Sequence, residues 1–305
     1  MSLTDYPHGI TSFGIPQLGS SGLIPATSGS YFWVDSSVGN NGTGAFDSPM
    51  KTLMAAYALC TASKADVIIM KPGHTETITG NATLLFDKIG VTVVGLGSGA
   101  LRPAFTMTGT TTAVKANVTG ASQTFRNFTM TAGVDELVTV WLISAADCTI
   151  DAVDYLDNAA ASIASYVTTV AAGDRFTLKN CKIVNSVATT LAGAAVTLVG
   201  SDDSLIENNY IWHLNTNADV SGGIASISTV CLRLRLINNT IVCPAGNAVT
   251  PINTVTSTTG IAAFNKVGCA KTAAAAGIVL TSMYSIENYI TAAVNKSGIL
   301  DPVIS

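Results

Sequence analysis

Apolar and polar positions recur along the C-terminal two thirds of the chain with a loose period of about 23 to 30 residues. Each repeat pairs an apolar stretch with a second β-rich stretch that is usually marked by asparagine. The second stretches overlay as seven segments, at 125–128, 150–153, 178–183, 205–211, 236–241, 263–267 and 286–290. The first stretches begin near Val114, Val138, Val167, Val196, Ile224, Val249 and Ile278. Such a period predicts stacked supersecondary units rather than one closed core.

The repeat predicts an all-β solenoid in which each repeat forms one rung. Apolar strands at 67–70 and 91–94 add two rungs before the seven repeats, so we expect about nine rungs over residues 67–290. The composition agrees, because 48% of the residues are hydrophobic and only 11% are charged, against roughly 25% in an ordinary soluble domain. β-Branched residues favour strands, and Asn and Gly favour the turns between them.

The residues before the repeats divide into two parts. Residues 1–30 are rich in Gly and Pro and also apolar, which predicts an extended N-terminal arm for anchoring or oligomer contact. Residues 31–66 predict an N-terminal cap that consists of a strand, a Gly-rich loop and a helix. Asp47 or Ser48 is the expected N-cap of that helix, with Pro49 in its first turn. Residues 291–305 form the C-terminal tail.

The stretch from Tyr31 to Gly73 resembles the start of right-handed parallel β-helix proteins of the pectate-lyase-like superfold. The resemblance lies in the strand ending in Val-Asp, the Gly-rich loop, the run from Ser48 to Leu53 and the final Pro-Gly. Together with the asparagine-bearing rungs it covers roughly residues 31–290. The resemblance implies a single-stranded right-handed parallel β-helix. Function stays open, because this superfold includes lyases, hydrolases, tailspikes and catalytically silent virion proteins.

The recurring asparagines are predicted to be structural corners. An asparagine between two strands accepts a left-handed backbone conformation and bonds neighbouring backbone groups through its amide. Repeated in every turn, the amides can bond one another along the solenoid. The predicted corners are Asn127, Asn180, Asn208, Asn238, Asn265 and Asn288.

Three aspartates are the candidates for chemistry. Asp147, Asp174 and Asp203 occupy comparable positions just before the asparagine-marked strands of successive rungs, and glycoside hydrolysis needs two carboxyl groups that flank the scissile bond. The other motifs of polygalacturonases have no counterpart here, and Arg175 is a single basic residue where a pectate-lyase site would also need an acidic calcium cluster. Aspartates that bond local backbone in turns explain the same pattern. We therefore predict that these residues are not catalytic.

No metal or cofactor is predicted. Asp147, Asp151, Asp154 and Asp157 form an acidic run without the spacing of a calcium loop, which favours a solvated face. The Gly-rich loop at 39–44 lacks the Lys of a phosphate-binding loop.

Charge and apolar runs exclude several classes of protein. A net charge of −4 without a basic patch argues against nucleic acid, and the apolar runs are too short for a membrane helix. No signal peptide is recognisable, so assembly in the host cytoplasm and free thiols at all six cysteines are expected.

Taken together, the sequence predicts a non-enzymatic structural protein of a bacteriophage virion. We expect a head decoration, cement or knob protein at the virion surface. Its expected partners are two further copies in a homotrimer and the major capsid protein, or another virion protein, through the N-terminal arm; surface glycans are a further candidate. Two alternatives stay open: a polysaccharide-degrading β-helix enzyme or tailspike, and a carbohydrate-binding module without turnover.

Overall fold

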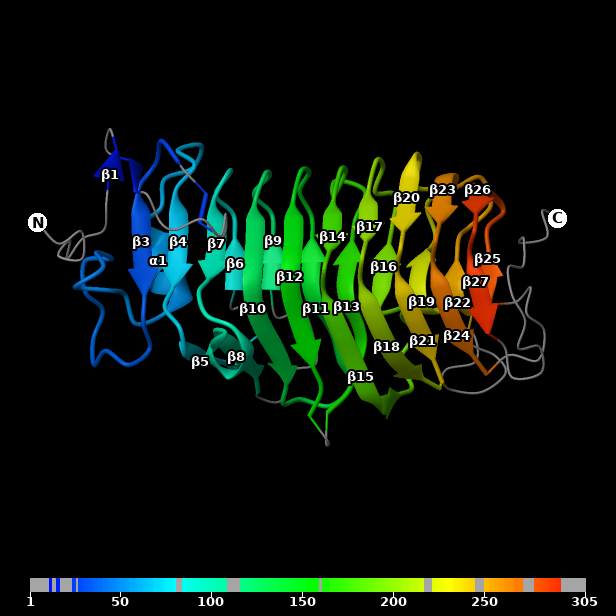
Figure 1. Ribbon diagram of the computed structural model, residues 1–305, viewed down its shortest axis with the longest axis horizontal. Coiled ribbons are helices and arrows are strands. Elements are labelled where there is room, and N and C mark those ends of the chain that lie inside the picture. Colours follow the sequence, from blue (N-terminus) through cyan, green and yellow to red (C-terminus); the bar gives the residue numbers. More distant parts are fainter. Residues whose placement is uncertain are drawn as a thin grey trace, which may run out of the picture.

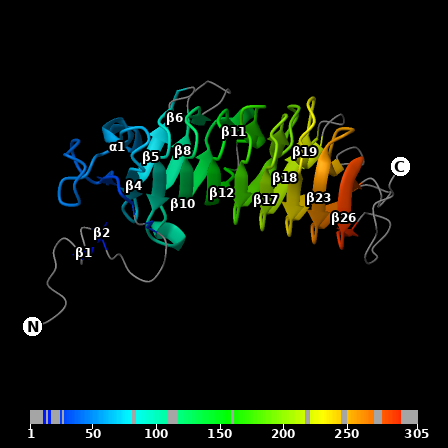
Figure 2. The same cartoon turned by 90° about the horizontal axis from the view of Figure 1, so that it is seen from above.

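The computed structural model is an elongated solenoid in which short strands stack side by side along one axis (Figure 1, Figure 2). It describes residues 11–12, 15–16, 24–25, 27–80, 84–108, 116–158, 161–216, 221–244, 250–270 and 277–291. Nearly all of its ladders are parallel. The predicted all-β parallel β-helix is confirmed.

Each turn of the solenoid visits three sheets. The first sheet contains β3 (Tyr31–Val34), β4 (Val67–Met70), β7 (Thr92–Gly95), the first parts of β10 (Thr124–Ala132) and β12 (Thr149–Leu156), β14 (Thr177–Lys179), β17 (Leu205–Glu207), β20 (Leu234–Ile237), β23 (Thr259–Ala263) and β26 (Ser282–Ile286). The second contains β5 (Thr75–Ile78), β8 (Ala104–Met107), the later parts of β10 and β12, β15 (Lys182–Thr189), β18 (Tyr210–Asn215), β21 (Thr240–Cys243), β24 (Lys266–Cys269) and β27 (Tyr289–Thr291).

The third sheet closes each turn with β6 (Leu84–Phe86), β9 (Ala116–Val118), β11 (Leu137–Ile143), β13 (Ile163–Thr169), β16 (Val196–Leu198), β19 (Ser221–Ser226), β22 (Thr250–Asn253) and β25 (Ile278–Val279). Its eight strands define about eight complete turns within the described residues, rather than nine. β3 precedes them, and β26 with β27 follows as an incomplete turn. Outside the sheets lie the antiparallel pair β1 (Thr11–Ser12) and β2 (Ile15–Pro16) and the 3₁₀ turn η1 (Gly99–Leu101).

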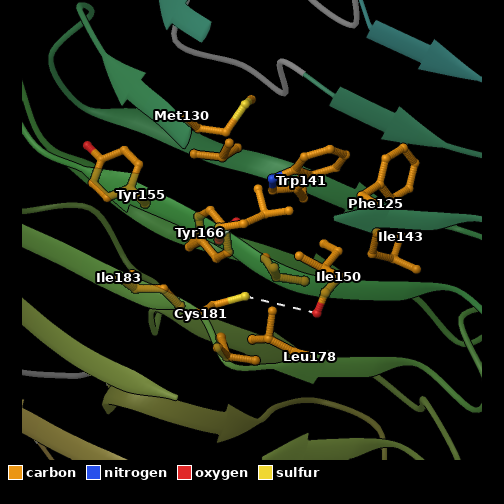
Figure 3. Close-up of a cluster of buried hydrophobic side chains, with 14 of the residues drawn as sticks. Phe125, Met130, Trp141, Ile143, Ile150, Tyr155, Tyr166, Leu178, Cys181 and Ile183 are labelled. Atoms are coloured by element: carbon orange, nitrogen blue, oxygen red, sulfur yellow. Dashed lines mark hydrogen bonds between the residues drawn. The ribbon is translucent and has the colours of Figure 1, made fainter. Parts of the chain in front are cut away.

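The interior is filled by apolar side chains that repeat from one turn to the next. Figure 3 shows part of this core, where Phe125 and Trp141 approach with ring centroids 4.8 Å apart. Phe125, Trp141, Ile150 and Tyr166 are all completely buried. Phe86 of an earlier turn packs against both Phe125 and Trp141, with ring centroids 4.6 and 6.1 Å apart. Burial of apolar surface therefore stabilises the stacking of turns as well as the single turn.

The helix before the first complete turn differs in detail from the prediction. α1 spans Leu53–Leu59, and its N-cap is Thr52, whose hydroxyl accepts a hydrogen bond from the Ala55 amide. The predicted N-cap at Asp47 or Ser48 was wrong: Ser48 closes a loop by accepting amides through its carbonyl and hydroxyl oxygens. Met50 then pairs with Val34 as a β-bridge, so the helix cannot start earlier.

The contacts of α1 fix it to the start of the solenoid. Leu53 and Tyr57 are buried, and the Tyr57 ring meets Phe86 edge to face at 5.2 Å. The Lys88 ammonium donates to the carbonyls of Tyr57, Ala58 and Cys60, which satisfies the C-terminal end of the helix. The role of α1 as a cap of the stack stays a prediction.

Most of the predicted arm and tail lies outside the described residues. Within the arm, Pro25 and Ser30 contact the body: the Tyr31 hydroxyl donates to the Pro25 carbonyl, and the buried Asp66 carboxylate accepts the Ser30 amide at 2.7 Å. Of the tail, only Thr291 is described, at the end of β27.

The predicted asparagine corners fall into two neighbouring rows. Asn127, Asn180, Asn208 and Asn238 have φ between 52° and 59° and occupy the bend between the first and second sheets, where their side chains reach the surface. Asn265 and Asn288 belong to the next position along the chain, where the side chain points inward and is buried. The bend accepts the left-handed conformation, whereas the inward position supplies the hydrogen bonds between turns.

The inward row is an asparagine ladder that runs through four turns. Its members are Asn209, Asn239, Asn265 and Asn288, all of them buried. The Asn239 Oδ1 accepts both the backbone amide and the side-chain amide of Asn209, at 3.1 and 3.0 Å, and its own Nδ2 donates to the Ile206 carbonyl and to Asn265. The ladder therefore satisfies polar groups that the bend would otherwise leave buried without partners.

Replacing Asn239 by alanine should destabilise the protein strongly. The substitution leaves at least two buried groups without partners, which costs about 2–4 kcal/mol of unfolding free energy. The measurement is chemical unfolding followed by circular dichroism.

The matched control is Asn238→Gly at the preceding, exposed position. Glycine keeps its positive φ of 52° and only the surface bond to Asn208 is lost, so we expect a change below about 1 kcal/mol. Equal losses in the two variants would contradict the assignment of the inward row as the stabilising one.

Candidate functional site

The candidate aspartates lie at the corner where the third sheet returns to the first. At this corner, one residue in each of four successive turns adopts a left-handed conformation: Asp147 (φ 62°), Arg175 (φ 55°), Asp203 (φ 55°) and Arg233 (φ 56°). Such a conformation costs energy in non-glycine residues, although aspartate tolerates it better than most. The corner therefore presents alternating acidic and basic side chains along the solenoid axis.

These alternating charges form two bidentate ion pairs between turns. Arg175 donates through Nε and Nη2 to the two carboxylate oxygens of Asp147, at 2.6 and 2.8 Å. Arg233 binds Asp203 in the same way, at 2.6 and 2.7 Å. The backbone stacks as well, because the Asp147 amide donates to the Asp174 carbonyl. A planar guanidinium matches a carboxylate in this arrangement, so each pair ties one turn to the next.

Asp174 does not share a row with the other two candidates. It precedes the left-handed position by one residue, and its Oδ1 accepts the Asp202 backbone amide at 2.8 Å. Asp202 repeats this contact with the Leu232 amide of the following turn. The three candidate residues thus occupy two rows. The carboxylates of one row bind arginines, and the carboxylate of the other row accepts a backbone amide, so each already has a partner.

The electrostatics of the corner disfavour general acid catalysis. Hydrogen bonding from Arg175 lowers the pKa of Asp147, and hydrogen bonding from Arg233 lowers the pKa of Asp203. A glycosidase acid must hold its proton near neutral pH, which requires the opposite shift. The sequence predicted that the aspartates recur from one rung to the next. Their pairing with arginines could not be predicted, because it depends on which residues of successive turns lie opposite each other.

The second acidic run is also engaged in contacts between turns. Asp151 is buried next to Arg126 and accepts the Asn180 side-chain amide, whereas Asp154 binds Arg102 at 2.6 Å. Asp157 accepts the backbone amide and the hydroxyl of Ser186. In the described part of the chain, no group of three or more His, Cys, Asp or Glu side chains is placed to hold a metal ion. The predicted solvated face is therefore a network of paired carboxylates.

Two of the histidines are buried away from these carboxylates. His74 bonds Glu76 at 2.8 Å, and His213 donates from Nε2 to the Ile163 carbonyl. Burial lowers the pKa of His213, so its imidazole is neutral near pH 7. Neither is positioned by the corner aspartates.

A shallow groove of about 330 Å³ lies on the outer face of the third sheet. It is lined by Val138, Ser165, Thr168, Ala192, Gly193, Ala194, Thr197, Ala225, Ile227 and Asn253. None of these side chains is ionisable. The groove therefore offers hydroxyl and amide contacts but no acid, base or nucleophile with a shifted pKa.

A second shallow groove, of about 370 Å³, lies on the outer face of the second sheet, near its C-terminal end. It is lined by Thr240, Ile241, Val242, Lys266, Val267, Gly268, Tyr289 and Thr291. Gly268 leaves the surface low between its register partners Val242 and Thr291, and the Tyr289 ring is 41% exposed at the rim. An aromatic ring, an ammonium group and two hydroxyls together form the kind of surface that contacts sugars.

Comparisons with known proteins agree on the fold alone. No family model matches the chain, and no curated protein matches it. Among solved structures, a rhamnogalacturonan lyase matches at 12% identity with a TM-score of 0.45, over 79% of this chain and 74% of that one. The pectate lyase Pel9A matches at 15% identity with a TM-score of 0.49, over 89% and 79%. The parallel β-helix is established by the strand ladders of the structure itself, and neither match supports the expected resemblance to virion proteins.

The corner ion pairs make a prediction about acid titration. Because the pKa of Asp147 in the folded state lies below its ordinary value of 3.8, its contribution to stability is full above that value and disappears as the pH falls through the lowered pKa. Carbon-13 NMR of the carboxyl group should show this low pKa, and Arg175→Gln should move it back towards 3.8. An Asp147 or Asp203 that titrates between about pH 5 and 7 would instead identify a general acid.

Proposed function

We propose that this protein is a non-enzymatic structural component of a bacteriophage virion, a decoration or knob protein on the capsid surface. The observation that carries the proposal is the state of the corner carboxylates. Asp147 and Asp203 are bound bidentately by arginines of adjacent turns, and Asp174 accepts a backbone amide. Residues that catalyse sugar cleavage would face a shared groove with a free acid and a free base.

The composition and the packing support the same proposal. A chain with 11% charged residues has placed several of its charges in contacts between turns, which rigidifies the body. No helix of the described chain is long and apolar enough to cross a membrane. A rigid solenoid with few charges suits the surface of a particle, because copies of the chain associate there with one another and with the capsid.

The proposal includes a homotrimer and a tether to the major capsid protein through residues 1–30. Deleting residues 1–23 removes the tether but keeps Pro25 and Ser30, which contact the body. We expect the truncated protein to keep its circular dichroism spectrum and to lose attachment to purified particles. Attachment at the level of the full chain would refute the tether, and a low copy number confined to the tail would refute the capsid location.

A cleavage assay separates the proposal from a polysaccharide depolymerase. The full chain should release no reducing ends or unsaturated products from polygalacturonate, rhamnogalacturonan or capsular polysaccharide. If the full chain released products, and Asp174→Asn or Asp203→Asn abolished that release, the proposed non-enzymatic function would be wrong. Folding of both variants should be checked first, because both carboxylates make contacts between turns.

The second candidate function is carbohydrate binding without turnover, which the groove on the second sheet favours. Lys266, Tyr289 and Thr240 lie in one register row, and the described residues supply no ion-pair partner for the Lys266 ammonium. Glycan-array binding that Tyr289→Ala reduces at least tenfold would support this function. The matched control is Tyr284→Ala, since Tyr284 is 76% exposed in β26 but lies outside the groove. An array without any hit would exclude the groove as a site for the glycans tested.

A further inference from the structure

Two cysteines face each other across neighbouring turns. Cys243 is the last residue of β21 and Cys269 is the last residue of β24, and the two strands pair in parallel with Cys243 directly opposite Cys269. In the ladders of the described residues, no other cysteine has a cysteine as its register partner. The pair is therefore a specific arrangement and not a result of cysteine abundance.

Both thiols lie on the inner side of the second sheet. Ile241 and Val267, two residues earlier in each strand, are buried in the core, and side chains alternate along a strand, so Cys243 and Cys269 point the same way. Cys243 is fully buried, whereas Cys269 is half-buried at the edge of the core. Cys269 is therefore the more exposed residue of the two, and Cys243 lies directly opposite it in the ladder.

The backbone geometry permits a bond between the two sulfurs. Neighbouring strands lie about 4.8 Å apart, and in-register Cα atoms at that separation fall inside the range of about 4.4–6.8 Å found for disulfides. The Cβ atoms, which lie roughly 4.8 Å apart in such a ladder, must come closer by about 0.3–1.3 Å, because disulfides prefer about 3.5–4.5 Å between them. Both cysteines end their strands, so this adjustment does not break a ladder that continues on both sides.

We propose that Cys243 and Cys269 are an oxidation site that forms a disulfide between turns when the folded chain meets a small-molecule disulfide such as glutathione disulfide. The Cys269 thiol loses its proton to solvent, and the thiolate attacks one sulfur of glutathione disulfide and releases one glutathione thiolate. Cys243, once deprotonated, attacks the Cys269 sulfur of this mixed disulfide and expels the second glutathione. Two protein thiols are oxidised and one glutathione disulfide is reduced to two glutathione thiols.

The order of the two steps follows from exposure. Cys269 is the less buried residue, while burial raises the pKa of Cys243 and makes its thiol the slower nucleophile, so Cys269 reacts first. The remaining cysteines have other surroundings. Cys181, for example, occupies the asparagine ladder, where its backbone amide donates to Asn209.

The bond would staple two turns close to the C-terminal end of the solenoid. Each turn of a solenoid contacts only its neighbours, so an end turn can separate without disturbing the middle of the stack. A link between β21 and β24 prevents the last turns from separating independently. This inference does not depend on the proposed virion function.

The test is a peptide map of the full chain after incubation with glutathione disulfide and without reduction. Trypsin cleaves after Arg235, Lys266 and Lys271, so Cys243 and Cys269 fall in separate peptides, 236–266 and 267–271, each with one cysteine. We expect these two peptides to be joined, and the number of thiols titrated after unfolding to fall from the six of the reduced chain to four. Reduction should separate the peptides.

A thermal measurement tests the consequence for stability. Oxidation should raise the melting temperature of the wild-type protein by several degrees. It should leave that of Cys269→Ser unchanged. The matched control is Cys60→Ser, because a serine hydroxyl keeps the bond to the Ala56 carbonyl and the Cys243–Cys269 pair stays intact. Two results with the wild-type chain alone would overturn the proposal. One is that six thiols are still titrated after prolonged oxidation of the folded chain, and the other is that glutathione remains bound to Cys269.

Discussion

The structure depends on one interaction above all, the in-register parallel stacking of each turn on the next. Backbone ladders hold the strands, but a turn must also bend, and every bend brings polar groups close to an apolar interior. The buried asparagines resolve this conflict, since the Asn239 amide bonds Asn209 on one side and Asn265 on the other. Once the bends are satisfied, apolar rows such as Ile206, Leu236 and Ala262 can fill the interior beside them without a break.

The same stacking decides what the charged residues do. The pairs Asp147–Arg175 and Asp203–Arg233 each join two successive turns, and Arg102 reaches from one turn to carbonyl and carboxylate groups of later ones. Exposed pairs of this kind contribute little each, but their repetition fixes the register at the corner. A carboxylate held in this way stays ionised and occupied by its partner, and this is the observation on which the proposed structural role rests.

Much of the fold could be predicted, because a repeat of hydrophobic and polar positions directly reflects the turns of a solenoid. At the asparagine corners, the detail that the sequence left open is a shift of a single residue. Asn238 and Asn239 are adjacent, yet one stabilises a left-handed bend and the other bonds inside the core. Two features of the sequence indicate which asparagine points inward. Asn238 and Asn239 are adjacent, so only one of them can face the core, and the apolar Ile241 lies two residues after Asn239 and therefore on the same side of the strand. Ser48 was predicted to start a helix because its type suits an N-cap, but the bridge at Met50 takes precedence.

By itself, the sequence determined the period, the turns and the residue types at each corner, since these follow from local propensity and from the alternation of apolar side chains. Only the tertiary structure decided which corner residues meet. Arg175 reaches Asp147 rather than its neighbour Asp174, and Cys243 faces Cys269, because stacking brings together positions that lie about one turn apart along the chain. A shift of one residue turns a side chain from the surface to the interior, and the loose period left that register open.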